Sequence, residues 1–174
     1  MSIPSDATRR VRHPGGRVKS SILAKGGYTI LKEALRHILR RPVVGIAAAC
    51  RTEDDKWLLI RRGDSGEWAL PGGTLEWGEK LSIAILRELE EEAGVTELRL
   101  GRLIGVYSEP SRDPRFHAVT VVVEAIIQPP SKPPSNPVEI LEARLFSREE
   151  LPGELSHNMT PMLRDALAGT TRLE

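Results

Sequence analysis

The chain of 174 residues has one cysteine, few aromatic residues and no long apolar run. A single cysteine excludes an internal disulfide framework, and because Cys50 stands in an apolar segment, we expect a small core residue in a reducing cytoplasm. Aromatic residues are 4% of the chain, so the core must be aliphatic. No apolar run approaches the roughly 18–20 residues that span a bilayer, and the N-terminus shows no apolar signal segment. We therefore expect one cytoplasmic globular domain with a terminal extension.

Acidic residues are scarce in the first part of the chain. Residues 1–41 hold ten Lys/Arg against Asp6 and Glu33, a net charge of about +8, whereas the whole chain carries +1. From residue 28 to 41 leucine and isoleucine recur at helical spacing and Pro42 ends the pattern, which predicts a short amphipathic helix. The arm has no interleaved aromatics and no DNA-binding motif, so we do not expect it to bind nucleic acid or a membrane.

Residues 42–174 are expected to form the folded domain. Short apolar runs bounded by turn residues predict strands, at 43–50, 56–60, 67–73, 98–109, 118–127 and 139–147. Helical spacing predicts a strong helix at 80–93, with Gly94 as its left-handed cap, and a closing helix at 159–168. Strands before and after one strong helix indicate an α/β (α+β) fold.

The stretch "RELEEEAGV", which spans the end of the helix at 80–93 and its cap, crowds four glutamates into six positions. At about 100° per residue, Glu88, Glu91 and Glu92 share one face and Glu90 points elsewhere. Carboxylates grouped beside an apolar stripe are unfavourable unless a cation neutralises them, and oxygen ligands favour Mg²⁺, with Mn²⁺ as a substitute. An ordinary solvated acidic helix face would explain "ELEEE" taken alone.

The longer segment "GGTLEWGEKLSIAILRELEEEAGV" resembles the signature of the Nudix hydrolase family. That signature is Gly, five residues, Glu, seven residues, Arg-Glu-aliphatic, one residue, Glu-Glu, one residue, Gly-aliphatic. The positions are filled in order by Gly73, Glu79, Arg87-Glu88-Leu89, Glu91-Glu92 and Gly94-Val95. The resemblance covers about residues 43–168 and leaves the basic arm outside.

The resemblance implies an α/β/α sandwich around a mixed β-sheet and a Mg²⁺-dependent hydrolase. It also implies site roles: Glu88, Glu91 and Glu92 as metal ligands with the Gly72 carbonyl, Glu92 as a catalytic glutamate, Arg87 orienting the glutamates, and Glu79 bracing the loop and helix or reaching the metal through water. The general base in the family often precedes the last strand, where Glu139 is the only acid of "QPPSKPPSNPVE". Glu142 and a glutamate of the signature remain alternatives.

The substrate is suggested by "GVYSEPSRDPRFH", which resembles a segment of Nudix enzymes that act on ADP-ribose and related nucleotide sugars, with Glu109 in place of Asp and Phe116 in place of a usual Gly. Pro110 stands near a proline typical of those enzymes. Arg112 and Arg115 either contact phosphate or ribose, or form a self-bonded turn around Asp113. Arg61 and Arg62 face either the diphosphate or solvent, and Trp68 either stacks on a base or packs in the core.

We therefore expect hydrolysis of ADP-ribose or another nucleoside diphosphate sugar to a nucleoside monophosphate and a sugar phosphate. The alternatives are a nucleoside triphosphate pyrophosphohydrolase of the MutT type and a ligand-sensing Nudix regulator. The resemblance also implies a homodimer, in which the helix at 28–41 packs on the partner subunit unless the arm is disordered.

Overall fold

The computed structural model describes residues 41–113 and 116–174, and Pro42–Glu174 forms a single compact unit. The predicted basic arm and its helix lie outside the described residues, except for Arg41. The α-helices are α2 (Leu81–Ala93) and α3 (Thr160–Ala168), and the strands are β1 (Val43–Arg51), β2 (Trp57–Arg62), β3 (Trp68–Ala69), β4 (Gly72–Thr74), β5 (Leu98–Tyr107), β6 (Ala118–Ile127), β7 (Ile140–Phe146) and β8 (Arg172–Leu173). Short 3-10 turns occupy Arg148–Glu150 and Ser156–Asn158.

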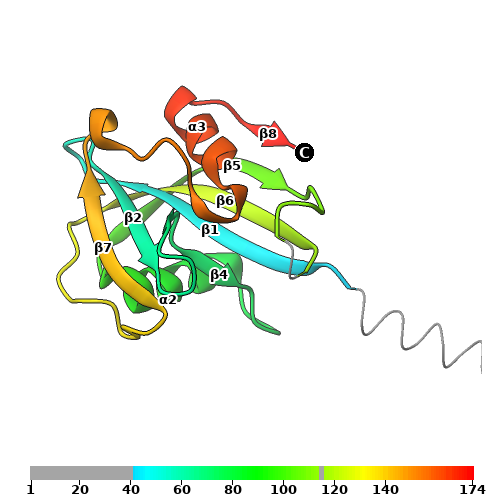
Figure 1. Ribbon diagram of the computed structural model, residues 1–174, viewed down its shortest axis with the longest axis horizontal. Coiled ribbons are helices and arrows are strands. Elements are labelled where there is room, and N and C mark those ends of the chain that lie inside the picture. Colours follow the sequence, from blue (N-terminus) through cyan, green and yellow to red (C-terminus); the bar gives the residue numbers. More distant parts are fainter. Residues whose placement is uncertain (1–40, 114–115) are drawn as a thin grey trace, which may run out of the picture. The chain divides into compact units, whose positions relative to one another are not determined.

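The strands form one mixed sheet with β1 near its centre (Figure 1). The main path runs β3-β2-β1-β6-β5-β8, while β4 pairs with β1 and β7 pairs with β2. The β1–β6 and β5–β8 pairs are parallel and the others are antiparallel. No α-helix in the described part of the chain has the length and apolar content needed to cross a membrane.

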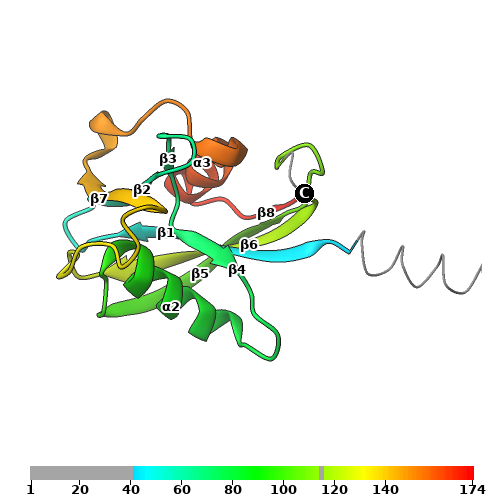
Figure 2. The same ribbon diagram turned by 60° about the horizontal axis from the view of Figure 1, so that its bottom comes forward.

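The two helices cover opposite faces of the sheet, α2 on one and α3 on the other (Figure 2). Strand β1 explains the arrangement, since successive side chains of a strand point to opposite faces. Ile46, Ala48 and Cys50 join the core under α2, whereas Ala47 and Ala49 join the core under α3. Because both faces of β1 are covered, "GIAAAC" is apolar throughout. The α/β/α sandwich expected from the sequence is confirmed.

Helix α2 begins after Lys80 and ends at Gly94, whose φ of 64° is left-handed, as the sequence predicts. Its buried stripe of Ala84, Ile85, Leu89 and Ala93 packs on the sheet, and Glu92 is buried beside it. The predicted strand at 67–73 is divided into β3 and β4 around Leu70-Pro71. Packing thus fixes one edge of α2 against the sheet and leaves its acidic edge beside β4.

Candidate functional site

A cavity of about 340 Å³ lies where β4, the acidic edge of α2 and the loop before β6 meet. Three glutamates line it, Glu88, Glu92 and Glu139, together with Arg62. The rest of its wall is made by Gly45, Ile46, Gly72, Gly73, Thr74, Arg112, Asp113, Phe116, Ala118, Thr120, His157, Met159 and Met162. This volume lies within the range of small-molecule sites.

Two glycines bring the backbone of β4 against the carboxylates. A Cβ at Gly72 would lie 2.2 Å from the carbonyl oxygen of Ile46, so a side chain there would collide with β1. A Cβ at Gly73 would lie 2.2 Å from Oε1 of Glu88. The Gly72 N–H donates to Oε2 of Glu92 at 2.7 Å. Gly72 therefore lets β4 pack against β1, and Gly73 leaves room for the Glu88 carboxylate of α2 beside β4.

Glu92 is only 7% exposed, and its ionised form is unfavourable there. Burial raises its pKa to about 8, and the negative charges of Glu88 and Glu139 act in the same direction. The Gly72 hydrogen bond and the charge of Arg62 act against this rise. Burial also raises the pKa of Glu88, although Arg87 opposes the change. A raised carboxylate pKa in a cavity is typical of a functional site.

Arg87 connects the loop of the signature before α2 with α2 itself. Its Nε and Nη2 donate to the two carboxylate oxygens of Glu79 at 3.0 and 3.1 Å. Its Nη1 donates to Glu88 at 2.9 Å and lies 3.6 Å from Glu91. The loop is closed by a bond from the Glu76 N–H to Glu79 at 3.1 Å. The predicted roles, Arg87 orienting the glutamates and Glu79 bracing the loop, would require contacts of this kind.

The three signature glutamates expected to converge are not equally placed. Glu88 and Glu92 line the cavity, whereas the side chain of Glu91 is 55% exposed and lies outside the lining set. Within residues 41–113 and 116–174, no three acidic, histidine or cysteine side chains are grouped closely enough to hold a metal ion as they stand. Glu88, Glu91 and Glu92 share one face of the helix, but the side chains of Glu88 and Glu91 pair with Arg87.

The donor chemistry nevertheless fits a hard divalent cation. Glu88, Glu92 and Glu139 offer only oxygen atoms, which Mg²⁺ and Mn²⁺ prefer. The negative charges of Glu88 and Glu139 raise the pKa of Glu92, so these groups repel one another. A bound cation would remove this repulsion. The Gly72 carbonyl and Glu91 stay predictions as ligands.

Glu139 and Glu142, the two candidate bases outside the signature, differ in position. Glu139 is exposed at the cavity wall, where the Asn136 side-chain amide donates to it at 3.3 Å. Glu142 lies within β7 opposite Arg61 and is not among the lining residues. The structure thus brings Glu139, and not Glu142, together with the signature glutamates.

The two arginines at the end of β2 are separated by an irregularity in the pairing of β2 with β7. Arg62 lines the cavity, and it binds Asp64 at 2.8 Å. Arg61 is exposed, and its Nε donates to the Gly66 carbonyl at 3.0 Å. Of the two arginines expected to face either the diphosphate or solvent, Arg62 therefore lies at the cavity and Arg61 does not.

The predicted substrate contacts Trp68, Pro110 and Arg112 lie in different surroundings. Trp68 packs edge-to-face on Phe146, with ring centroids 4.8 Å apart, in the core under α3. Pro110 is exposed in a turn, and Arg112 is 9% exposed at the cavity wall. Arg115 lies outside the described residues. Of the substrate contacts predicted from the sequence, the structure brings Arg62 and Arg112 to the cavity among the residues that it describes.

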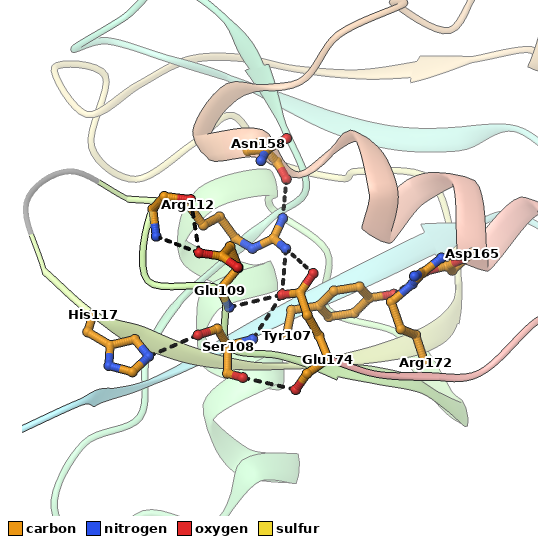
Figure 3. Close-up of polar contacts among 10 residues, drawn as sticks. Tyr107, Ser108, Glu109, Arg112, His117, Asn158, Asp165, Arg172 and Glu174 are labelled. Carbon is orange, nitrogen blue, oxygen red and sulfur yellow. Dashed lines mark hydrogen bonds and ion pairs between the residues drawn. The ribbon is translucent and has the colours of Figure 1, made fainter.

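Sequence reasoning missed the far wall of the cavity, formed by His157, Met159 and Met162. These three residues belong to no recognised sequence motif, and in the sequence Met162 is simply one apolar residue of the helix α3. Glu174 was also missed, although it binds Arg112 at 2.7 Å (Figure 3). An ion pair between residues 62 positions apart leaves no local signal in the sequence.

A family model described as the NUDIX domain matches residues 39–166. An ADP-ribose pyrophosphatase of Methanocaldococcus jannaschii is 45% identical over 73 residues, which are 40% of this chain and 43% of that protein. The chain thus matches less than half the length of that curated relative.

Solved structures match over a larger share of the chain. An ADP-ribose pyrophosphatase of Streptococcus suis has a TM-score of 0.62 and 26% identity, covering 77% of this chain and 100% of that one. A MutT NUDIX hydrolase of Burkholderia pseudomallei has a TM-score of 0.60 and 30% identity, covering 72% of this chain and 98% of that one.

Proposed function

Because the chain belongs to the NUDIX domain family, we propose that it hydrolyses the diphosphate linkage of ADP-ribose or a related nucleoside diphosphate sugar with Mg²⁺. One observation carries the proposal. A single cavity has carboxylates in one part of its wall and a mixed wall of arginine, histidine, phenylalanine and methionine in another. The first part suits a metal-bound diphosphate, and the second offers polar and apolar contacts for a nucleoside or sugar.

In this reaction Glu88 and Glu92 would hold the cation, and Arg87 keeps Glu88 oriented through its bond of 2.9 Å. When bound, Mg²⁺ supplies positive charge that neutralises the diphosphate and lowers the pKa of a coordinated water. Glu139 is the base that we propose, since it lies at the same cavity and is held by Asn136. It would accept the proton of the water that attacks phosphorus. Arg62 would bind a phosphate oxygen by a charge-assisted hydrogen bond.

Relatives support the choice of substrate class. Two of the matched proteins are described as ADP-ribose pyrophosphatases, and the segment "SEPSRDPRFH" supplies Arg112, Asp113 and Phe116 to the cavity. A substrate panel with Mg²⁺ tests this choice, with ADP-ribose, GDP-mannose and nucleoside triphosphates. We expect a nucleoside monophosphate and a sugar phosphate as products, and no turnover by Glu92→Gln above about 1% of wild type. Turnover of triphosphates alone would refute the assignment.

A second candidate is the triphosphate pyrophosphohydrolase of the MutT type, which the likeness to the Burkholderia pseudomallei MutT structure favours. Its products would be a nucleoside monophosphate and pyrophosphate. Chromatography of the products therefore separates the two functions, since only the sugar substrate gives a sugar phosphate.

The assembly and domain boundaries stay predictions. We propose a homodimer, with residues 42–174 as the Nudix domain and the basic residues 1–41 as an arm outside it. Light scattering of the full chain tests the dimer, and the mass of a single chain, 19.2 kDa, would contradict it.

A further inference from the structure

Arg112 joins three segments of the chain at the wall of the cavity (Figure 3). Its Nη2 donates to both carboxylate oxygens of Glu174 at 2.7 Å, and its Nη1 donates to the Asn158 carbonyl. Its guanidinium carbon lies 5.5 Å from the centre of the Tyr107 ring. One buried cation thus ties the loop 108–113 to the turn 156–159 and to the residues after α3.

Glu174 is itself fixed in place by the neighbouring strand. Its Oε2 accepts the N–H groups of Ser108 and Glu109 at 3.1 and 3.0 Å. Its own N–H donates to the Val106 carbonyl at 3.0 Å, next to the parallel pairing of β8 with β5. The Glu174 side chain is 29% exposed and lies outside the set that lines the cavity. It can therefore affect a substrate only through Arg112 and the loop.

The turn held by Arg112 has a backbone that needs support. His157 and Asn158 have φ values of 50° and 51°, in the left-handed region that is unfavourable for residues other than glycine. The carbonyl of Asn158 is the one that Arg112 binds. Because His157 and Met159 line the cavity, the contact of Arg112 stabilises the turn that carries them there.

The guanidinium of Arg112 is held by the protein itself. Glu174 and Asn158 use its two Nη atoms, and its Nε is buried without a hydrogen-bond partner among the described residues. We propose that Glu174 is a positioning residue, which fixes Arg112 and through it the cavity wall formed by the loop 108–113 and the turn 156–159. This inference rests on the proposed function, because that wall would hold the part of the substrate beyond the diphosphate.

The test compares Glu174→Gln with a matched control. The amide keeps the shape of the side chain and removes the charge that holds Arg112. We expect KM for ADP-ribose to rise roughly tenfold with kcat within about twofold of wild type, because ground-state binding weakens while the carboxylates stay in place. Arg172→Gln is the control, since Arg172 lies on β8 two residues before Glu174, and its side chain pairs with Asp165 at 2.6 Å rather than with Arg112. Its KM should stay within about twofold of wild type.

Hydrogen exchange provides a readout that does not depend on activity. In Glu174→Gln we expect faster exchange in residues 108–113 and 156–159 and unchanged exchange in α2. In the control Arg172→Gln, the exchange rates of residues 156–159 and of α2 should both equal those of wild type. Exchange at 156–159 that equals wild type, a KM that does not move, or faster exchange that includes α2 would each overturn the inference. If wild type turns over no nucleoside diphosphate sugar, the proposed function fails, and the exchange pattern alone decides whether Glu174 positions the wall.

Discussion

Removing the charge of Glu92 should stabilise the metal-free protein at pH 8. Glu92 is buried and held by the Gly72 N–H, and burial raises its pKa from 4.5 to about 8. In Glu92→Gln the amide oxygen can still accept the Gly72 hydrogen bond, so the variant loses the charge while its shape is kept.

The sign and size of the effect follow from proton linkage. The folded carboxyl binds its proton more tightly than the unfolded one, so the free energy of unfolding falls as the pH rises from about 4.5 to 8. A shift to about 8 corresponds to a loss of at most about 4 kcal/mol at pH 8. Glu92→Gln lacks this loss, so the two proteins should be similar near pH 5 and diverge toward pH 8. Asp64 and Asp165 act outside this window, because the pKa of each is lowered to about 2.

Urea unfolding at pH 5, 6, 7 and 8 in EDTA measures the effect. Glu90→Gln, on the same helix, is the control, since Glu90 is exposed and lies 3.5 Å from Lys132, away from the cavity. Mg²⁺ at pH 8 should stabilise wild type more than Glu92→Gln. Parallel stability curves for wild type and Glu92→Gln from pH 5 to 8 would refute the reasoning.

Three further predictions concern the base, the glycine loop and the α3 ion pair. Glu139→Gln should lower kcat for ADP-ribose at least roughly a hundredfold with KM within about threefold in steady-state kinetics; an unchanged kcat would rule out Glu139 as the base. Gly73→Ala should push the Glu88 carboxylate away and reduce kcat/KM about tenfold, while urea unfolding changes by less than about 1 kcal/mol; a large stability loss with full activity would contradict this. Asp165→Asn should destabilise the protein by about 1–3 kcal/mol in urea at pH 7, because Tyr107 and Arg172 both donate to the carboxylate. Because the pKa of Asp165 is lowered to about 2, wild type should lose the same stabilisation as the pH falls from about 4 to 2, and an equal acid midpoint for both proteins would argue against it.

The elements with a strong local pattern could be predicted from the sequence. Helix α2 and its Gly94 cap follow from helical spacing and a left-handed glycine, and β6 has the bounds that the apolar run predicts. Cys50 is fully buried, as its apolar neighbours suggested. In these cases the residues that decide the structure are adjacent in the chain.

The parts of the site that depend on distant pairing could not be predicted in the same way. The choice between Arg61 and Arg62 depends on an irregularity between β2 and β7, which no local pattern records. The helix angle places Glu91 on the same face as Glu88 but does not give its distance from β4. The short strand β8 and the Glu174 contact form only because residues 172–174 meet β5 across the fold.

The parallel pairing of β1 with β6 also bears on the order of folding. Val43 pairs with Ala118, so the centre of the sheet joins segments that are far apart in the chain. Contacts of high sequence separation slow folding, because the intervening loop must close before they form. During synthesis β1, β2 and β4 emerge before β6, so the edge of β1 that pairs with β6 stays unpaired until β6 has been made. Such an edge can pair with strands of other chains. The yield of folded protein should therefore fall as the chain concentration during folding rises, even if the folded protein is stable.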